Sequence, residues 1–181
     1  VNQTCPFDEL VACDDGSTDG TVDILADFAR HSPSPVHLVC NPKRLGVVKN
    51  FEQAISLCSG ELIVLADQDD TWHVTKLECL LQALAEPGVG LAFSDADVVD
   101  ERSSPLGYTM WQRVGFNKSE QERMVAGDGL GVLLKHFVVT GATLAFRANL
   151  RSLLLPLPPE WPHDAWIASV AAAVTTLHPI D

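Results

Sequence analysis

The stretch ELIVLADQDDTW, residues 61–72, decides the fold. It opens with an unbroken apolar run, Leu62–Ala66, in which Ile63 and Val64 are β-branched. Such a run predicts a strand buried on both faces, in a parallel or mixed sheet that is covered by helices. Three carboxylates follow the strand, namely Asp67, Asp69 and Asp70. Because ligands of open α/β sheets bind at the carboxyl ends of strands, we expect the functional site here.

The three carboxylates favour a divalent cation. Two unit charges ~4 Å apart repel by roughly 4 kcal/mol at an effective dielectric of ~20, and a cation relieves that repulsion. Carboxylate oxygens suit Mg²⁺ or Mn²⁺, and Mg²⁺ completes its shell with water and substrate phosphates. The spacing Asp67-x-Asp69 therefore suggests a metal–diphosphate site. The alternative is a solvated acidic turn in which Asp70 or Thr71 caps the next helix.

Composition and charge place the chain among ordinary globular proteins. Its 181 residues suffice for one well-buried domain, which we expect to span 1–181, and are few for two. Hydrophobic residues make up 46% and charged residues 20%, both usual values. The formal net charge of -12 argues against nucleic acid as a partner. A metal could still mediate binding of an anionic nucleotide.

The cysteines and the apolar segments bear on the compartment. The five cysteines are widely spaced and form no C-x-x-C, so neither a zinc site nor a disulfide framework is indicated. We therefore expect a reducing, cytoplasmic location. No apolar run is long enough to span a bilayer. The most apolar segment, Ala165–Leu177, is expected to be a core helix, with a membrane-proximal helix as the alternative.

Strand and helix patterns alternate along the chain. Strands are expected at residues 9–13, 36–40, 62–66, 89–93 and 138–146. Helices are expected at 21–30, 47–59, 73–86, 127–135 and from 163 onward. Between 101 and 124 the pattern loosens, as in a surface insertion or an acceptor-facing loop. Gly141, within one expected strand, would let a ligand or backbone approach closely.

Acidic pairs end three of the expected strands. They are Asp14/Asp15, Asp67/Asp69 and Asp95/Asp97. The alternation of strand and helix, with acidic strand ends on one edge, predicts a doubly wound α/β domain with one ligand cleft. A basic cluster, Lys43, Arg44 and Lys49, is either a counter-charge for phosphate or a solubilising surface.

Six blocks of sequence together resemble one family. They are DDGSTDGT (14–21), NPKRLGVVKNFEQAI (41–55), ADQDDTW (66–72), FSDADVVDE (93–101), VTGATLAF (139–146) and HDAWIA (163–168). In this order and at these intervals they resemble the nucleotide-sugar glycosyltransferases of family 2, especially the rhamnosyltransferase-like branch. The resemblance implies the GT-A fold, a mixed, mostly parallel sheet flanked by helices.

The resemblance implies a metal-dependent hexosyltransferase that moves a sugar from a nucleoside diphosphate to an acceptor hydroxyl with inversion. Asp164 matches the family's general base; taken by itself, it reads as an acid favoured by the dipole at a helix N-terminus. Asp67 and Asp69 match the motif that holds nucleotide and Mn²⁺ or Mg²⁺, with Asp69 as the direct ligand. The remaining positions are implied as nucleotide contacts (Asp14, Asp15, Arg44, Gln68) and as donor or acceptor sugar contacts (Asp70, Trp72, Gly141, His163, Trp166).

The implied partners are a nucleoside-diphosphate sugar, possibly dTDP-rhamnose, and a saccharide or lipid-linked saccharide acceptor in cell-surface polysaccharide synthesis. The full-length protein could associate peripherally with the inner face of the membrane. Two departures from the family suggest a chain trimmed at both ends. Only Asn2–Thr4 precede the family's second strand, and the family's later metal-binding histidine is expected beyond Asp181.

Two other functions compete with glycosyl transfer. Asp67–Thr71 also fits the D-x-D-x-T signature of haloacid-dehalogenase-like phosphatases, with Asp67 as nucleophile, Asp69 as general acid and Mg²⁺ bound. That family places the motif at its first strand, whereas two expected strands precede it here. The third possibility is a non-catalytic module that binds a nucleotide or glycan without turnover.

Overall fold

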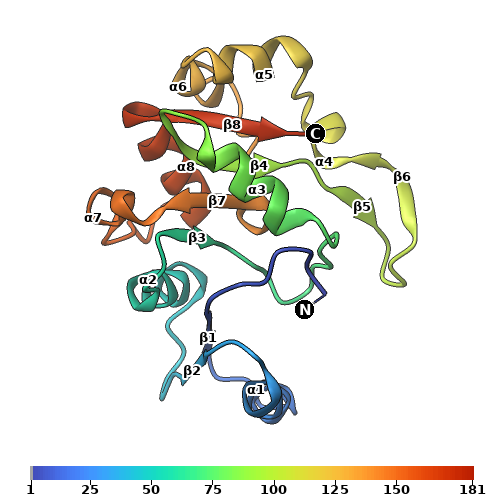
Figure 1. Ribbon diagram of the computed structural model, residues 1–181, viewed down its shortest axis with the longest axis vertical. Helices are drawn as coiled ribbons and strands as arrows, with labels where there is room; N and C mark the ends of the chain where they lie inside the picture. Colours follow the sequence, from blue (N-terminus) through green and yellow to red (C-terminus); the bar gives the residue numbers. More distant parts are fainter. Residues whose placement is uncertain (1) are drawn as a thin grey trace.

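The structure is a computed structural model that describes residues 2–181. Its N-terminal part is a β-α-β unit (Figure 1). Strands β1 (Leu10–Asp14) and β2 (Val36–Cys40) pair in parallel, and helix α1 (Thr21–His31) connects them. Helix α2 (Val47–Leu57) follows and ends two residues earlier than expected, because Cys58 is extended. The sequence prediction for this part is confirmed, with the first strand displaced by one residue.

A four-stranded sheet lies at the centre, in the order β3-β7-β4-β8. Its strands are β3 (Leu62–Val64), β4 (Val89–Ser94), β7 (Leu144–Arg147) and β8 (Thr176–Ile180). Strands β4 and β8 are parallel, whereas β7 is antiparallel to β3 and to β4. Three of the four strands therefore point the same way, but only the β4–β8 pairing is parallel, so the sheet is mixed rather than mostly parallel. Since β1 and β2 form a ladder of their own, the strands do not make one continuous doubly wound sheet.

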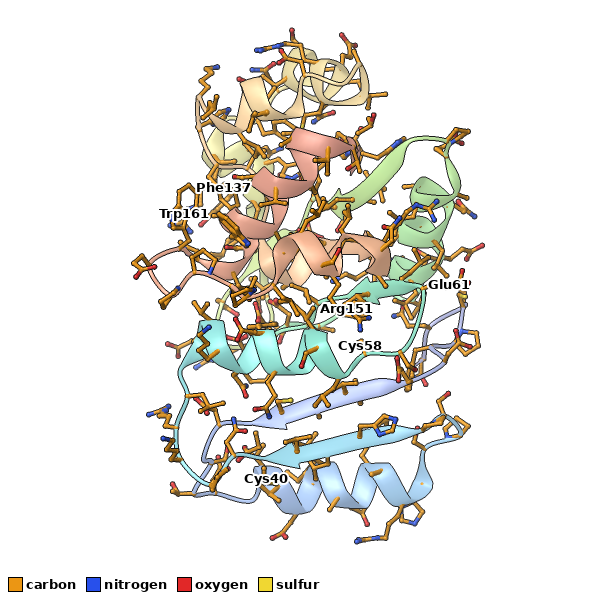
Figure 2. The ribbon with its side chains drawn as sticks, turned by 90° about the vertical axis from the view of Figure 1, so that its left-hand side faces the viewer. Cys40, Cys58, Glu61, Phe137, Arg151 and Trp161 are labelled. Carbon is orange, nitrogen blue, oxygen red and sulfur yellow. The ribbon has the colours of Figure 1, made fainter. Side chains whose placement is uncertain are left out.

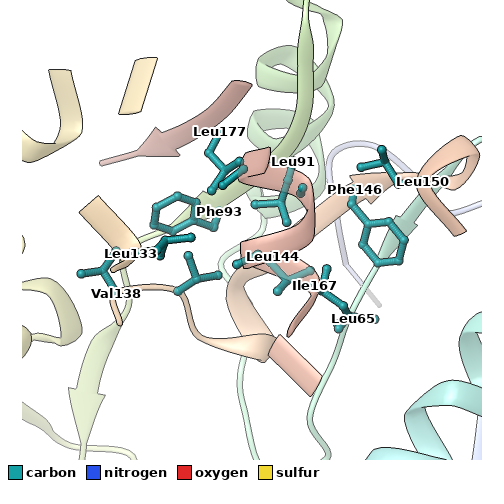
Figure 3. Packing of buried hydrophobic residues seen from close by; sticks show 14 of the residues in the cluster. Leu65, Leu91, Phe93, Leu133, Val138, Leu144, Phe146, Leu150, Ile167 and Leu177 are labelled. Atoms are coloured by element: carbon teal, nitrogen blue, oxygen red, sulfur yellow. The ribbon is translucent and has the colours of Figure 1, made fainter. Parts of the chain in front are cut away.

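Helices cover both faces of the four-stranded sheet. Alternate residues of β4 point to opposite faces, so Leu91 and Phe93 pack with α8 (His163–Val174), and Ala92 packs with α3 (Lys76–Ala85). Figure 3 shows the larger cluster, in which Phe93 and Phe146 are fully buried. Each buried phenylalanine contributes about 1.5–3 kcal/mol. The core therefore fixes the sheet against the helix that carries the expected base.

The strand expected at 62–66 differs from the structure in two ways. It is shorter, although the Leu65 amide still bonds to the Leu144 carbonyl at 3.1 Å. Ile63 and Leu65 are buried, but Leu62 and Val64 are only half-buried. The reason is that β3 pairs with β7 alone and lies at the edge of its sheet. The expectation of burial on both faces was therefore wrong for half of the run.

The segment after β4 is more regular than the sequence suggested. Strands β5 (Asp97–Val99) and β6 (Pro105–Thr109) pair in antiparallel fashion, and helices α4 (Met110–Val114) and α5 (Lys118–Val125) follow. Each helix begins with a capping box, in which side chain and backbone at the helix start bond reciprocally. Aromatic rings from α4 and the loop after it pack on Phe93, so this segment is part of the core. It is not a plain surface insertion.

Three further expectations need correction. The strand expected at 138–146 begins only at Leu144, after the 3₁₀ helix η1 (Gly141–Thr143). The apolar segment 165–177 is not one helix, because α8 ends at Val174 and β8 begins at Thr176. Helix α3 has Thr75 at its N-cap, so neither Asp70 nor Thr71 caps it.

The remaining elements close the core. They are α6 (Gly129–Leu133), the 3₁₀ helix η2 (Ala148–Leu150) and α7 (Arg151–Leu154). All five cysteines are free, and Figure 2 shows Cys40 and Cys58 on separate elements. None of the helices within residues 2–181 is both long and apolar enough to cross a membrane.

Candidate active site

The loop after β3 carries the acidic cluster. Asp67 is half-buried, whereas Asp69 and Asp70 are exposed. Burial raises the pKa of the Asp67 carboxyl above its usual value; the nearby His163 ring lowers that pKa, and the negative charges of Asp70, Asp69 and Asp164 raise it. Two of these neighbours belong to α8. The structure therefore brings the end of β3 and the start of α8 together.

Asp164 lies in the first turn of α8, and its carboxylate is held by two backbone amides. Oδ2 accepts a hydrogen bond from the Gly141 amide at 3.1 Å, and Oδ1 accepts one from the Ala165 amide at 2.8 Å. The helix dipole also favours a negative charge at this end. A carboxylate has about four lone-pair sites, so Asp164 can still accept a proton or a hydrogen bond.

His163 is buried beside this carboxylate, with 9% of its surface exposed. Its ring stacks on Phe51, with centroids 3.9 Å apart and an interplanar angle of 12°. Its Nε2 atom is buried and has no hydrogen-bond partner within residues 2–181. Burial lowers the pKa of His163, although the charges of Asp164 and Asp67 act in the opposite direction. The ring therefore carries one buried nitrogen without a partner in the described part of the chain, close to the Gly141 backbone.

Gly141 makes this arrangement possible by close approach. A Cβ atom at residue 141 would lie 2.8 Å from Nε2 of His163 and 3.5 Å from Cβ of Asp164. Real Cβ atoms essentially never come within 3.0 Å of another heavy atom. The sequence led us to expect a ligand or a backbone segment close to Gly141, whereas the group that approaches is the His163 side chain. A role for Gly141 in sugar binding stays a prediction.

Lys76, at the start of α3, is a site residue that sequence reasoning missed. Its Nζ atom donates to the Ala142 carbonyl at 2.5 Å and lies 4.1 Å from the centroid of the Trp72 ring. Burial lowers its pKa to about 8, against the opposing influence of Asp70 and Asp67. The only sequence signal is a lysine a few residues after the aspartates. Its contact with residue 142 is long-range and could not be read from the pattern.

The two tryptophans expected at the site differ in their surroundings. Trp72 is half-buried and faces the ammonium of Lys76. Trp166 packs against the core, its Nε1 donates to the Leu154 carbonyl at 2.9 Å, and its ring meets Trp161 edge-on. The indole N–H of Trp166 is thus engaged within the protein. Gln68 is exposed.

Asp14 and Asp15 shape a loop at the end of β1. Asp14 accepts hydrogen bonds from the backbone of the following turn, and Ser17 in particular lowers its pKa. Asp15 accepts from the Leu45 amide at 2.7 Å and the Gly46 amide at 2.8 Å, bonds that lower its pKa with help from the charge of Arg44. Asp14 therefore folds the turn before α1, and Asp15 folds the loop before α2. Nucleotide binding by Asp14, Asp15 and Arg44 stays a prediction.

The third acidic pair has a different task from the one expected. Oδ1 of Asp95 accepts hydrogen bonds from the Ala96 amide at 2.8 Å and the Trp111 amide at 3.0 Å, which anchors α4. Asp97 is exposed within β5. Asp95 thus serves the packing of α4, and the expectation that all three acidic pairs line one cleft stays a prediction.

The residues after β3 suit a divalent cation in type but are not a complete cage. Within residues 2–181, no three histidine, cysteine or acidic side chains converge tightly enough to hold a metal ion. Asp67 and Asp69 offer carboxylate oxygens, which Mn²⁺ and Mg²⁺ prefer. Mg²⁺ commonly takes only one or two protein carboxylates and fills its shell with water and phosphate oxygens. The donor set thus fits a cation that arrives with a diphosphate.

An apolar pocket of about 290 Å³ reaches Asp164 from the side of α4. Its walls come from three segments that meet there, and the residues are Met110, Val114, Phe137, Val138, Val139, Thr140 and Pro162. Figure 2 labels Phe137 and Trp161, which are 37% and 48% exposed. The carboxylate is therefore open to a molecule that enters through this pocket.

Comparison with known families identifies the family of the chain. A family model described as "Glycosyl transferase family 2" matches residues 1–152. The chain belongs to this family. The match ends before α8, so it does not include His163 and Asp164.

Curated relatives and solved structures agree with this assignment. The chain is 28% identical over 106 residues to a putative teichuronic acid biosynthesis glycosyltransferase, TuaG, of Bacillus subtilis, covering 59% of this chain and 42% of the relative. It is 26% identical over 133 residues to the Escherichia coli glucosyltransferase WfgD, covering 74% and 49%. The chain thus spans about half the length of these relatives.

Two solved structures share the fold across 99% of the chain. They are the Pyrobaculum calidifontis mannosyltransferase PcManGT in complex with GDP-Man and Mn²⁺ (TM-score 0.70, 22% identity, 48% of that chain) and S. aureus TarS 1–349 in complex with UDP (TM-score 0.72, 17% identity, 51% of that chain). The predicted GT-A fold is confirmed.

Proposed function

We propose that the chain carries the catalytic residues of an inverting glycosyltransferase, which moves a sugar from a nucleoside diphosphate to an acceptor hydroxyl. One observation carries the proposal: an acidic loop suited to a metal–diphosphate lies near a carboxylate suited to a base, because Lys76, which follows the loop, bonds to Ala142, and the adjacent Gly141 amide bonds to Asp164. Membership of glycosyl transferase family 2 supports it.

Asp164 acts as the general base in this proposal. Its carboxylate accepts the proton of the acceptor hydroxyl while the hydroxyl oxygen forms a bond to the anomeric carbon. The bond from that carbon to the diphosphate oxygen breaks, and its electron pair leaves with the nucleotide. Because attack and departure occur on opposite faces, a single displacement inverts the centre. The Gly141 and Ala165 amides hold the carboxylate in one orientation throughout.

Asp67 and Asp69 would hold Mn²⁺ or Mg²⁺, with Asp69 as the direct ligand, and the bound cation would hold the diphosphate of the donor. The cation supplies Lewis acidity that neutralises the charge growing on the departing diphosphate. The solved mannosyltransferase, a complex with GDP-Man and Mn²⁺, supports this chemistry.

The acceptor enters through the pocket that ends at Asp164. The full name of WfgD gives its acceptor as an N-acetylglucosamine linked to diphosphoundecaprenol, and TuaG is named for teichuronic acid biosynthesis. We therefore propose a saccharide or lipid-linked saccharide as acceptor, in cell-surface polysaccharide synthesis at the inner face of the membrane. The resemblance of the six sequence blocks to the rhamnosyltransferase-like branch is the ground for proposing dTDP-rhamnose as the donor.

Thermal unfolding with UDP or dTDP, each with and without Mn²⁺, tests the donor site. A ligand that binds only the folded state raises the melting temperature. We expect a rise that needs both nucleotide and Mn²⁺ and that Asp69→Ala abolishes, while Asp164→Ala keeps the rise and loses transfer. Transfer at an undiminished rate by Asp164→Ala would refute the assignment of the base.

The same experiment separates the alternatives. A non-catalytic module would show the metal-dependent rise but no transfer to any acceptor by the wild type. A phosphatase would release inorganic phosphate from a phosphate ester, and the family assignment removes the support for that alternative.

A further inference from the structure

Lys76 joins parts of the chain that are far apart in sequence. Its ammonium donates to the carbonyl of Ala142, 66 residues away, and faces the ring of Trp72. Trp72 lies in the loop after β3 that carries Asp67, Asp69 and Asp70, here called the aspartate loop. An ammonium over a tryptophan ring is attracted by the negative face of the π-system. Lys76 therefore ties η1 to the loop that follows β3.

The element that Lys76 holds is the one that positions Asp164. Ala142 lies in η1 next to Gly141, whose amide donates to Oδ2 of Asp164 across 23 residues of sequence. The bonds of Thr143 to the Thr140 carbonyl, from its amide at 2.9 Å and its hydroxyl at 2.8 Å, keep η1 a compact turn. A displacement of Ala142 would therefore move Gly141 with it.

We propose that Lys76 is a positioning residue that couples the aspartate loop to the base: its ammonium holds η1 through the Ala142 carbonyl, and η1 holds the Asp164 carboxylate through the Gly141 amide. The inference deepens the proposed function and rests on it for its catalytic consequence. The contacts themselves stand independently of the activity.

The charge of Lys76 provides a second readout with its own sign. The negative groups that face the ammonium are Asp70 and Asp67. Removing the ammonium makes the net charge around the loop more negative, so a cation should bind the loop at least as tightly. A residue that merely supported the loop would, when replaced, weaken cation binding and catalysis together.

The test compares Lys76→Met and Lys76→Arg with a matched control, Lys118→Met. Lys118 is 73% exposed and pairs with Asp181, so its replacement removes the same charge away from η1. Hydrogen exchange of the Gly141 amide measures the bond to Asp164, and electron paramagnetic resonance of free Mn²⁺ measures cation binding. Neither measurement needs a donor or an acceptor.

In Lys76→Met we expect exchange of the Gly141 amide to be faster by about tenfold, equivalent to about 1.4 kcal/mol. Mn²⁺ affinity should be unchanged or higher, and transfer should lose kcat with little change in donor KM. Lys76→Arg should restore most of the protection, because a guanidinium can still donate to the Ala142 carbonyl. Lys118→Met should resemble the wild type.

Unchanged Gly141 exchange in Lys76→Met would overturn the proposal. So would a joint loss of Mn²⁺ affinity and melting temperature, which would make Lys76 a supporting residue only. If the wild type transfers no sugar at all, the proposed function fails, but the exchange result still decides whether Lys76 positions Asp164.

Discussion

Replacing Gly141 by alanine should misplace the catalytic carboxylate while leaving the backbone conformation allowed. The new Cβ would lie 2.8 Å from Nε2 of His163, inside the 3.0 Å limit that real Cβ atoms respect. His163 cannot swing aside easily, because its ring is stacked on Phe51 at 3.9 Å. The strain must therefore be relieved by a movement of η1 or of the start of α8, and both carry groups that orient Asp164.

The magnitude follows from the overlap. Forcing an extra methyl group into a packed site costs about 1–3 kcal/mol. Each kcal/mol lowers the melting temperature of a chain of this size by about 2–4 °C. A displacement of a catalytic group by ~1 Å can cost about a hundredfold in rate. We therefore expect Gly141→Ala to show a modestly lower melting temperature and a kcat that falls far more than the stability.

Calorimetry and a transfer assay on purified protein measure the two effects. Gly60→Ala is the matched control, because the nearest atom to its new Cβ is a backbone oxygen at 3.5 Å, an ordinary contact. The reasoning is refuted if Gly141→Ala keeps wild-type kcat, or if Gly60→Ala impairs transfer equally.

Two further predictions concern pH. Hydrogen bonds from the Leu45 and Gly46 amides depress the folded-state pKa of Asp15, so its contribution to stability is present above the usual pKa of 3.8 and is lost as the pH falls below it. Asp15→Asn should therefore be less stable than the wild type in urea at neutral pH, and the difference should shrink in acid; a constant difference would contradict this origin. Burial lowers the pKa of Lys76 from 10.5 to about 8, so the unfolded chain binds more protons between these values and stability gains with rising pH. In metal-free buffer, the free energy of unfolding of the wild type should rise relative to Lys76→Met across that interval, and a flat difference would show that the lysine is not buried as described.

Local patterns in the sequence predicted the elements whose apolar residues are continuous and bounded. The strand predicted at 36–40, the run VHLVC before Asn41-Pro42, forms as β2. The strand predicted at 89–93 forms as β4 and extends by one residue. The boundary between α8 and β8 was missed because residues 165–177 are mostly apolar, with Ser169, Thr175 and Thr176 as their polar members. A helix buried on one side and a central strand then look alike.

Side-chain signals at residues 109–120 could have revealed α4 and α5. Thr109-x-x-Gln112 and Asn117-x-x-Glu120 both have capping-box spacing, and both form that motif. The weak hydrophobic periodicity hid them. Long-range contacts were beyond reach for a different reason, because nothing local to Lys76 or Asp95 specifies Ala142 or Trp111 as a partner.

The acidic residues show how chemistry and folding share one residue type. Sequence reasoning grouped three acidic pairs by their place after strands. The structure separates them: Asp14 and Asp15 fold the turn before α1 and the loop before α2, Asp95 anchors α4, and Asp67 lies near His163 and Asp164. Which carboxylates remain available for a ligand depends on which amides reach them, and tertiary packing decides that.

The central claim is that the loop with Asp67 and Asp69 and the carboxylate of Asp164 form one site. Paramagnetic broadening by Mn²⁺ in the presence of UDP, read from backbone amide signals, tests it most directly and requires no acceptor. We predict that amides of the loop after β3, of Gly141 and of Asp164 broaden first, and that Asp69→Ala removes the effect. Broadening confined to the loop around Asp15, or broadening at residues 67–70 that leaves Gly141 and Asp164 sharp, would contradict the account.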